Sequence, residues 1–472
     1  MNQQTPEYVE AYIAKLVEKA RVAQKYVEAK YTDQKSVDEL VRVAGKAIYD
    51  NAVALGQEAV AETGMGDLMG KVGKMKILSL RHWNFMKGRP SVGVIDDFSE
   101  PGVRVIAKPI GVLGSVTPST NPVATIIGNA MMAFKTRNAI IIAPHPASAK
   151  GAVHTTQIIR DALETIGAPA DLIQCIGEPS IAMTNELLKQ ADVNIATGGA
   201  GMVKAVYSSG KPAYGVGQGN CQAIVDEDYD NFERAAATIV ANRAFDQGVP
   251  CTGEQTMHVP AGREEEMKAA LRKAGAFIIE DQSVIDHIRE IVFPGPMINR
   301  AVVGKNVQQL GEIFGLKVPA EAKVICFKVQ AKGAEDILCK EILCPILRYT
   351  TYEKFEDAVD TAITNLENEG AGHSSSIWSK NEERILYVAN LIPVGRFHIE
   401  QPTMGSANNA IAPTVTIGCG SWGNNSISEN LQYYHLMNVT RVSTELPDPI
   451  IHAEEDWDVY EMRSEWGQKV RY

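Results

Sequence analysis

The sequence predicts an α/β protein in which two domains are each built on a parallel, doubly wound sheet. Three observations support this fold class. The chain of 472 residues is long enough for more than one domain. Short apolar runs alternate with helical patterns between residues 112 and 225, which is typical of βαβ units. A second series of strand-like runs begins near Asp230, so we expect an active cleft between two domains.

The first element is a helix that Thr5 can cap, with Pro6 at its first position. An apolar stripe recurs along it at helical spacing, formed by Val9, Tyr12, Ile13, Leu16 and Val17. The polar side mixes Glu with Lys rather than being basic. The helix is therefore expected to pack on its domain rather than to bind a membrane or act as a targeting segment.

Buried strands of the first series are predicted at residues 112–116, 139–143, 172–176, 193–197 and 223–225. Helical patterns separate them at residues 124–135, 151–166, 181–190 and 202–208. The second series has strand-like runs around residues 255–259, 324–328, 374–378 and 396–399. Strands separated by helices of this length favour parallel pairing in both sheets.

Composition excludes several classes of partner. The net charge is -11 and no block of Lys and Arg stands out, which argues against a nucleic-acid partner. No run of about 18 apolar residues occurs, so no membrane span is expected. The seven cysteines have no CxxC or zinc-like spacing, which predicts a reducing, cytoplasmic location and no metal site.

Two strand–turn–helix junctions predict a nucleotide site. Gly198, Gly199 and Gly201 would let the backbone approach a phosphate at the start of the next helix, although such turns are often purely structural. The other junction leaves Thr120 and Asn121 at the carboxyl edge of a sheet. Ligands of open α/β sheets bind at that edge.

Cys251 is the strongest candidate for a nucleophile. It lies between a glycine-containing turn and the strand-like run 256–259, with polar and small neighbours. In contrast, Cys175, Cys326 and Cys344 lie inside apolar runs, where a thiol simply packs. The turn before Cys251 leaves backbone N–H groups that can face a developing oxyanion.

Seven motifs in order carry a family resemblance. They are Thr-Asn-Pro (120–122), Thr-Gly-Gly-Ala-Gly (197–201), Gly-Lys-Pro-Ala-Tyr-Gly-Val-Gly-Gln-Gly-Asn (210–220), the segment around Cys251, Lys-Glu-Ile-Leu-Cys-Pro (340–345), Gly-Ala-Gly-His-Ser (370–374) and Gly-Cys-Gly-Ser-Trp-Gly-Asn-Asn-Ser-Ile-Ser (418–428). From about residue 8 to about 443 the chain resembles the CoA-acylating branch of the aldehyde dehydrogenase superfamily. It looks most similar to CoA-dependent succinate semialdehyde dehydrogenases, and related enzymes act on acetaldehyde, propionaldehyde or sulfoacetaldehyde.

The resemblance implies an aldehyde dehydrogenase-like architecture. A Rossmann-type cofactor domain would occupy residues 1–229 and an α/β catalytic domain residues 230–415. Residues 416–445 would return to the cofactor domain. Residues 103–107 and 437–442 alternate apolar and polar residues. With the segment 98–108, they resemble the family's oligomerisation hairpin and predict a homodimer or homotetramer. No function is assigned to the acidic tail 446–472.

The resemblance also implies roles for individual residues. Cys251 would attack the aldehyde as a thiolate, form a thiohemiacetal and lose a hydride to NAD or NADP, leaving a thioester. The oxyanion would face the N–H of Cys251 and a donor from the 120–121 pair. The ungapped match falls on Thr120, and we favour Asn121 because its amide is the better donor. Glu341 would hold the nicotinamide ribose. The other expected cofactor contacts are Thr117, Pro118, Thr120, Thr197, Gly198, Gly199, Ala200, Gly201, Met202 and Gly217.

A missing residue predicts the acyl acceptor. Hydrolytic members of the superfamily carry a glutamate in a Glu-Leu-Gly-Gly context that activates water, and Gly215 stands at the matching position here. A thiol is partly ionised near neutrality and strongly nucleophilic. The resemblance implies that this thiol, which accepts the acyl group, is coenzyme A.

Three further side chains are candidates. His373 could assist deprotonation of a thiol, although a lone histidine in a turn is often a surface residue. Arg243 and Arg396 could bind an anionic tail of the substrate, or they could be structural. Residues 143–148 lack a carboxylate for a ribose 2′-hydroxyl, so both NAD and NADP remain open.

Two alternatives remain beside the acylating dehydrogenase. A hydrolytic semialdehyde dehydrogenase of the same fold would form its product without CoA. A non-catalytic assembly subunit would keep the fold without the chemistry. Labelling by a thiol reagent, with protection by nucleotide, would distinguish the subunit from an enzyme.

Overall fold

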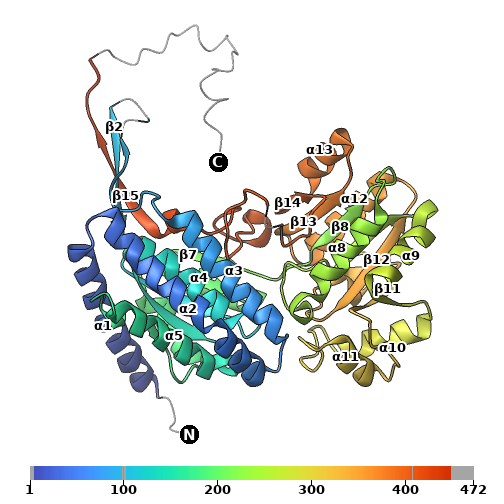
Figure 1. Ribbon diagram of the computed structural model, residues 1–472, viewed down its shortest axis with the longest axis horizontal. Coiled ribbons are helices and arrows are strands. Elements are labelled where there is room, and N and C mark those ends of the chain that lie inside the picture. Colours follow the sequence, from blue (N-terminus) through green and yellow to red (C-terminus); the bar gives the residue numbers. More distant parts are fainter. Residues whose placement is uncertain (1–4, 98, 100–101, 407, 448–472) are drawn as a thin grey trace.

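The computed structural model describes residues 5–97, 99, 102–406 and 408–447. In this part of the chain, two lobes each contain a parallel sheet, and a third, antiparallel sheet projects from the first lobe (Figure 1). The predicted fold class is confirmed. No described helix has the length and apolar character needed to cross a membrane. Residues 98, 100 and 101 of the expected hairpin and residues 448–472 of the tail lie outside the described residues.

The first lobe has a five-stranded parallel sheet in the order β5-β4-β3-β6-β7. Its strands are β3 (Val112–Thr117), β4 (Ala139–Pro144), β5 (Ile173–Cys175), β6 (Val193–Thr197) and β7 (Ala213–Val216). Its helices are α1 (Pro6–Lys30), α2 (Gln34–Thr63), α3 (Leu68–Met86), α4 (Pro122–Lys135), α5 (Ala149–Glu164), α6 (Ile181–Gln190) and α7 (Ala200–Tyr207). The chain runs outward from β3 to β5 and then resumes on the other side of β3, so the strand order reverses between β3 and β6.

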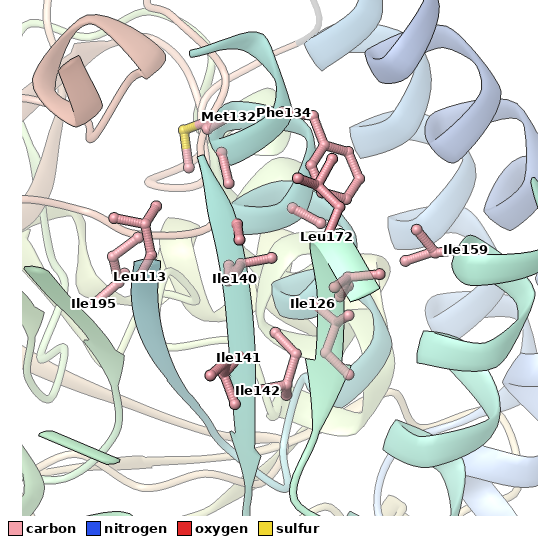
Figure 2. Packing of buried hydrophobic residues seen from close by; sticks show 14 of the residues in the cluster. Leu113, Ile126, Met132, Phe134, Ile140, Ile141, Ile142, Ile159, Leu172 and Ile195 are labelled. Carbon is pink, nitrogen blue, oxygen red and sulfur yellow. The ribbon is translucent and has the colours of Figure 1, made fainter. Parts of the chain in front are cut away.

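The core of this lobe surrounds β3, β4 and α4. Every residue of α4 is buried, as expected for a helix that is apolar on nearly all sides. Figure 2 shows the isoleucines of β4, residues 140–142, among side chains from neighbouring strands and helices. The N-terminal helix α1 starts as predicted, because Thr5 accepts a hydrogen bond from the N–H of Tyr8. The buried stripe of α1 faces the lobe, in contact with α6 and β4.

The second lobe has a seven-stranded parallel sheet in the order β10-β11-β12-β9-β8-β13-β14. Its strands are β8 (Gln222–Val225), β9 (Thr256–Pro260), β10 (Ala276–Ile279), β11 (Val324–Lys328), β12 (Ile346–Tyr352), β13 (Gly372–Trp378) and β14 (Val394–Ile399). The helices are α8 (Phe232–Ala244), α9 (Glu264–Ala274), α10 (Gln282–Val292), α11 (Val307–Phe314), α12 (Phe355–Asn368) and α13 (Glu382–Leu391).

One strand of the first series belongs to the other sheet. The run 223–225 becomes β8, which pairs with β9 and β13, so the second sheet begins before residue 230. The fifth strand of the first sheet is β7, which the sequence did not reveal. A short apolar run indicates that a strand is buried, but the same run fits either sheet, so the pattern does not identify the sheet to which the strand belongs.

The third sheet is antiparallel, with the order β1-β2-β15. It consists of β1 (Gly93–Asp97), β2 (Val103–Pro109) and β15 (Met437–Ser443). The segments 103–107 and 437–442, which resemble an oligomerisation hairpin in sequence, are direct neighbours in this sheet, with Val439 opposite Ala107. In Figure 1 the labels β2 and β15 mark this projection above the first lobe.

Candidate active site

Cys251 lies in the connection between α8 and β9, as expected for a thiol presented by a turn. The connection begins with a 3₁₀ turn, Phe245–Gly248. Three consecutive residues there are left-handed, with φ of 47° at Asp246, 54° at Gln247 and 68° at Gly248. Such a conformation is costly for non-glycine residues and persists only where the surroundings enforce it. The turn therefore needs an external anchor.

The carboxylate of Asp246 supplies that anchor. It is buried and lies 3.0 Å from Nζ of Lys71 on α3, and Lys74 forms a second ion pair with it. A Cβ at position 70 would lie 2.6 Å from Cβ of Asp246, so only glycine lets α3 approach so closely. Burial, with the neighbouring Lys74, lowers the pKa of Lys71 to about 8, while Asp246 favours its charged form.

The same lysine reaches the β3–α4 turn. Nζ of Lys71 donates to the carbonyl of Thr120 at 2.8 Å. The neighbouring Asn121 occupies the N-cap position of α4, and its side chain makes no capping hydrogen bond. Lys71 thus links the Cys251 connection to the turn in which the oxyanion donor is expected. The choice of Asn121 over Thr120 stays a prediction.

His373 faces Cys251. Its Nε2 lies 3.2 Å from Sγ of Cys251, and the whole side chain is buried at the start of β13. Burial, reinforced by the charge of Arg396, lowers the pKa of His373 to about 3. Burial and the carboxylate of Glu341 raise the pKa of Cys251 to about 12. The resting pair is therefore a neutral thiol beside a neutral imidazole.

Glu341 is also buried near the thiol. Its Oε1 accepts a hydrogen bond of 3.0 Å from the N–H of Gly219. A Cβ at Gly219 would lie 2.2 Å from the carbonyl oxygen of Cys251, so only a glycine fits between them. Burial and the nearby Glu369 raise the pKa of Glu341 to about 8. Glu341 is thus a buried carboxyl group next to the nucleophile rather than a solvated surface charge.

The two candidate arginines differ. Arg396 on β14 is buried beside Cys251, where its charge favours the thiolate form. Its guanidinium donates to Oγ of Ser374, at 2.9 Å from Nε and 2.6 Å from Nη2. Within the described residues Arg396 forms no ion pair, so a buried cation faces the site without a carboxylate.

Arg243 makes structural contacts with the main chain, and its expected role in binding substrate stays a prediction. The side chain is fully buried, and Nε donates to the carbonyl of Ile346 at 2.9 Å. Nη2 donates to the carbonyls of Ile342 and Cys344. Nε and Nη2 are thus directed at the main chain that follows Glu341, so Arg243 fixes this segment, whereas its buried Nη1 has no hydrogen-bond partner among the described residues.

The remaining expected cofactor residues lie at the carboxyl edge of the five-stranded sheet. Thr117 and Pro118 follow β3, Thr197 ends β6, and Gly198 to Met202 form the turn and first residues of α7. The edge lies at the β3/β6 switch point, where ligands of such sheets bind. The buried hydroxyl of Thr117 has no hydrogen-bond partner among the described residues. A Cβ built at Gly199, Gly201 or Gly217 would meet no atom within 4 Å, so the edge has room for a ligand.

Gly215 lies on β7, and its surroundings explain why no carboxylate occupies this position. A Cβ there would lie 2.8 Å from the ring of Tyr207 and 3.1 Å from Val203, both on α7. The hydroxyl of Tyr207 accepts hydrogen bonds from the N–H groups of Gly215 and Ser426. Tyr207 is therefore held in the space that a side chain at position 215 would need.

Sequence reasoning missed two residues of this site. Cys221, just before β8, contacts both Cys251 and His373. Glu254 is fully buried, and its carboxylate accepts hydrogen bonds from Asn242 and from the N–H of Thr403, which holds the Cys251 connection. Burial raises the pKa of Glu254 to about 7. Glu254 could have been noticed because an acidic residue is unusual three positions after a nucleophile in a buried connection; Cys221 gave no comparable signal.

One group of acidic residues, Asp226 to Asp228, has carboxylates close enough for a metal ion. Arg384 pairs with all three, and Ser379 donates to Asp226. The group is therefore part of a surface ion-pair network, and we assign it no metal.

Comparisons with known proteins agree with this geometry. The model of the aldehyde dehydrogenase family matches residues 3–438. The succinate-semialdehyde dehydrogenase (acetylating) of Clostridium kluyveri is 46% identical over 436 residues, covering 92% of this chain and 96% of that protein. An acetylating aldehyde dehydrogenase structure from Geobacillus thermoglucosidasius superposes with a TM-score of 0.90 at 34% identity, covering 95% and 99% of the two chains. The propionaldehyde dehydrogenase of Rhodopseudomonas palustris with bound propionyl-CoA gives 0.81 at 27% identity, covering 92% and 94%.

Proposed function

Because the chain belongs to the aldehyde dehydrogenase family, we propose that it is a CoA-acylating aldehyde dehydrogenase. It would convert a short aldehyde, CoA and NAD(P)+ to an acyl-CoA and NAD(P)H. One observation carries this proposal: Nε2 of His373 lies 3.2 Å from Sγ of Cys251, and glycine stands at position 215 in place of the water-activating glutamate.

The first half of the reaction would use Cys251 and His373. Sγ of Cys251 forms a bond to the aldehyde carbon while its proton moves to Nε2 of His373. The charge that develops on the carbonyl oxygen would face the N–H of Cys251 and the amide of Asn121. The carbon–hydrogen bond then breaks with loss of a hydride, and a thioester on Cys251 remains.

The carboxyl edge would hold the nicotinamide cofactor. When bound, this cofactor supplies the acceptor for the hydride. The unpartnered hydroxyl of Thr117 and the open space at Gly199, Gly201 and Gly217 fit a phosphate-bearing ligand. Glu341 would accept hydrogen bonds from the ribose. We propose that the five-stranded lobe binds the cofactor and that the seven-stranded lobe carries the catalytic residues. The choice between NAD and NADP stays open.

The second half follows from the residue at position 215. Without a glutamate there, the site lacks the base that activates water for attack on the thioester in hydrolytic enzymes. After His373 releases its first proton to solvent, the thiol of CoA would attack the acyl carbon and pass its own proton to His373. The Cys251–acyl bond would break, and the sulfur of Cys251 would take that proton from His373. The products are an acyl-CoA and the free enzyme.

We propose an anionic aldehyde as the substrate, such as succinate semialdehyde or sulfoacetaldehyde. The support is Arg396, a buried guanidinium beside Cys251 that has no acidic partner in the described part of the chain. A carboxylate or sulfonate can accept two parallel hydrogen bonds from the N–H groups of a guanidinium. Acetaldehyde and propionaldehyde remain the alternatives.

The assembly and location are also proposals. The projecting three-stranded sheet supports a homodimer or homotetramer. All seven cysteines are free thiols, which supports a reducing, cytoplasmic location.

A test without CoA distinguishes the candidates. The enzyme, an aldehyde of the panel and either NAD or NADP should give a burst of about one reduced cofactor per active site. Addition of CoA should restore continuous turnover, with an acyl-CoA as the product by mass spectrometry. The panel consists of acetaldehyde, propionaldehyde, succinate semialdehyde and sulfoacetaldehyde. Cys251→Ala is the matched control and should give neither burst nor turnover, while nucleotide still binds.

Other outcomes would support the alternatives. Steady formation of free acid without CoA would make the protein a hydrolytic dehydrogenase and would overturn the acylating assignment. Absence of turnover with every aldehyde, together with labelling of Cys251 that nucleotide does not affect, would favour a non-catalytic assembly subunit.

A further inference from the structure

A second thiol borders the catalytic pair. Cys221 immediately precedes β8, and its carbonyl accepts hydrogen bonds from the N–H groups of Gln255 and Thr256. These bonds fix Cys221 against the start of β9, which begins five residues after the nucleophile. The side chain is fully buried. Its Sγ lies 3.3 Å from the carbonyl oxygen of Cys251 and 3.7 Å from Nδ1 of His373.

The directions of these hydrogen bonds follow from counting protons. A thiol has a single hydrogen, and the carbonyl of Cys251 can only accept, so the S–H of Cys221 donates to that oxygen. Its sulfur is then an acceptor toward His373, and Nδ1 must carry the hydrogen of the neutral imidazole. Nε2 is consequently bare, and it faces Sγ of Cys251 at 3.2 Å. In the opposite tautomer, Nε2 would present a hydrogen to the thiol and could not take its proton.

We propose that Cys221 is a positioning residue that holds His373 in the tautomer whose Nε2 accepts the proton of Cys251. The inference rests on the proposed covalent mechanism and deepens it. Cys221 touches neither aldehyde nor CoA in this scheme; it acts through the imidazole, as a tautomer-setting partner does in other nucleophile–base pairs.

The other groups around His373 do not set the tautomer. Arg396 carries donors only, so it cannot accept from Nδ1. Burial raises the pKa of Cys221 well above its usual range and raises that of Cys419 to about 11. Both thiols therefore keep their protons at neutral pH. Within the described part of the chain, Cys221 supplies the hydrogen-bonding contact to Nδ1 of His373.

The test compares two variants of Cys221 with a matched control. Cys221→Val fills the volume without a hydrogen-bonding group, whereas Cys221→Ser keeps a donor and acceptor. Cys326→Val removes another fully buried thiol from the same sheet, on β11. The readouts are kcat, the KM of aldehyde, and the rate at which iodoacetamide alkylates Cys251 between pH 6 and 10.

Cys221→Val should lower kcat and alkylation at pH 7 by about tenfold, because loss of a hydrogen bond shifts the tautomer by about that factor. The KM should not change, and the slower alkylation should persist from pH 6 to 10, because the raised pKa of Cys251 leaves the thiol dependent on His373 over this range. Cys221→Ser and Cys326→Val should stay within about threefold of the parent. Nitrogen-15 spectra of the parent should show His373 protonated at Nδ1.

Alkylation needs neither aldehyde nor CoA, so its result is independent of the proposed activity. Parent-like alkylation and kcat in Cys221→Val would overturn the inference. The inference would also be contradicted if Cys221→Ser lost as much kcat as Cys221→Val while alkylation stayed unchanged. A change in packing alone would explain that pattern. Should Cys221→Val fail to fold, the spectrum of the parent decides, and an Nδ1 without a proton refutes the proposal.

Discussion

Arg396 shows how a single side chain can combine two electrostatic roles. It is a buried cation near Cys251, where it favours the thiolate and disfavours a charged His373. Removing a guanidinium from water without a carboxylate partner costs free energy. A protein retains such a group where a ligand supplies the missing negative charge. An anionic substrate tail would do so. The two roles predict different kinetics.

We expect Arg396→Gln to raise the KM of succinate semialdehyde and sulfoacetaldehyde by about tenfold or more relative to propionaldehyde. The reason is that a charge-assisted hydrogen bond contributes about 1.5–3 kcal/mol. Steady-state kinetics with the four aldehydes and saturating CoA measures the ratio. Arg234→Gln, at the exposed ion pair with Glu400, is the control and should leave the ratio unchanged. An equal loss for every aldehyde, with a shifted pH profile, would mean that Arg396 acts on Cys251.

Glu341 gives a prediction about pH. Its pKa is raised to about 8 by burial and Glu369, so the carboxyl is protonated below that pH and ionised above it. An ionised carboxylate accepts stronger hydrogen bonds from ribose hydroxyls. Nucleotide affinity should therefore rise as the pH increases from 7 to 9. Glu341→Gln should remove this rise, whereas the exposed Glu312→Gln should keep it. Fluorescence titration without aldehyde measures the affinity, and a parent affinity that is flat over this range would contradict the proposed role.

At the scale of elements, the site depends on how two turns are joined. Lys71 on α3 holds Asp246 before Cys251 and also the carbonyl of Thr120 after β3. Neither the left-handed turn nor its anchor could be predicted from the sequence. Asp246 and Gln247 are not glycines, so nothing in the sequence indicates a positive φ at these positions. The lysine that stabilises them lies about 175 residues away in the chain.

We expect Lys71→Met to lower both stability and turnover. Breaking a buried ion pair costs about 3–5 kcal/mol, and the lower end applies here because Lys74 still contacts Asp246. Turnover should fall further than the folded fraction does, since the 246–248 turn and the 120–121 turn lose their common anchor. Denaturant unfolding and kinetics on the folded variant measure the two effects.

The control for Lys71→Met is Lys46→Met, which breaks an exposed ion pair with Asp50 within α2. Such pairs contribute about 0–1 kcal/mol, so little should change. If Lys71→Met kept the turnover and stability of the parent, the buried lysine would not be the link between the two turns.

At the scale of the whole molecule, strands were easier to predict than their partners. β3, β4, β6 and β11 lie where their apolar runs indicated, because a buried parallel strand is a continuous hydrophobic segment. Sheet membership was not encoded in the same way, so β8 was grouped with the wrong sheet and β10 and β12 were missed. In the candidate site, motif positions alone were enough to propose Cys251 and Glu341. The contact between His373 and Cys251, and the burial of Arg243, required the three-dimensional arrangement.

The projecting sheet carries the last prediction. A three-stranded sheet is marginally stable unless one face is covered, and Val94, Val439 and Val442 are exposed on it. The strands β1 and β15 are its edges, and edges of this kind pair with another chain unless they are protected. The simplest cover is a second copy of the chain, related by twofold symmetry.

We therefore expect light scattering at micromolar concentration to give two or four times the chain mass of 51.3 kDa. Replacing both Val439 and Val442 with Asp should shift the protein toward the monomer, because burying two charges in the interface costs free energy. Asp at Val22, an exposed valine on α1, is the control and should leave the assembly intact. A parent mass near 51.3 kDa would show that the exposed valines of the projecting sheet are tolerated in water and that the sheet needs no partner.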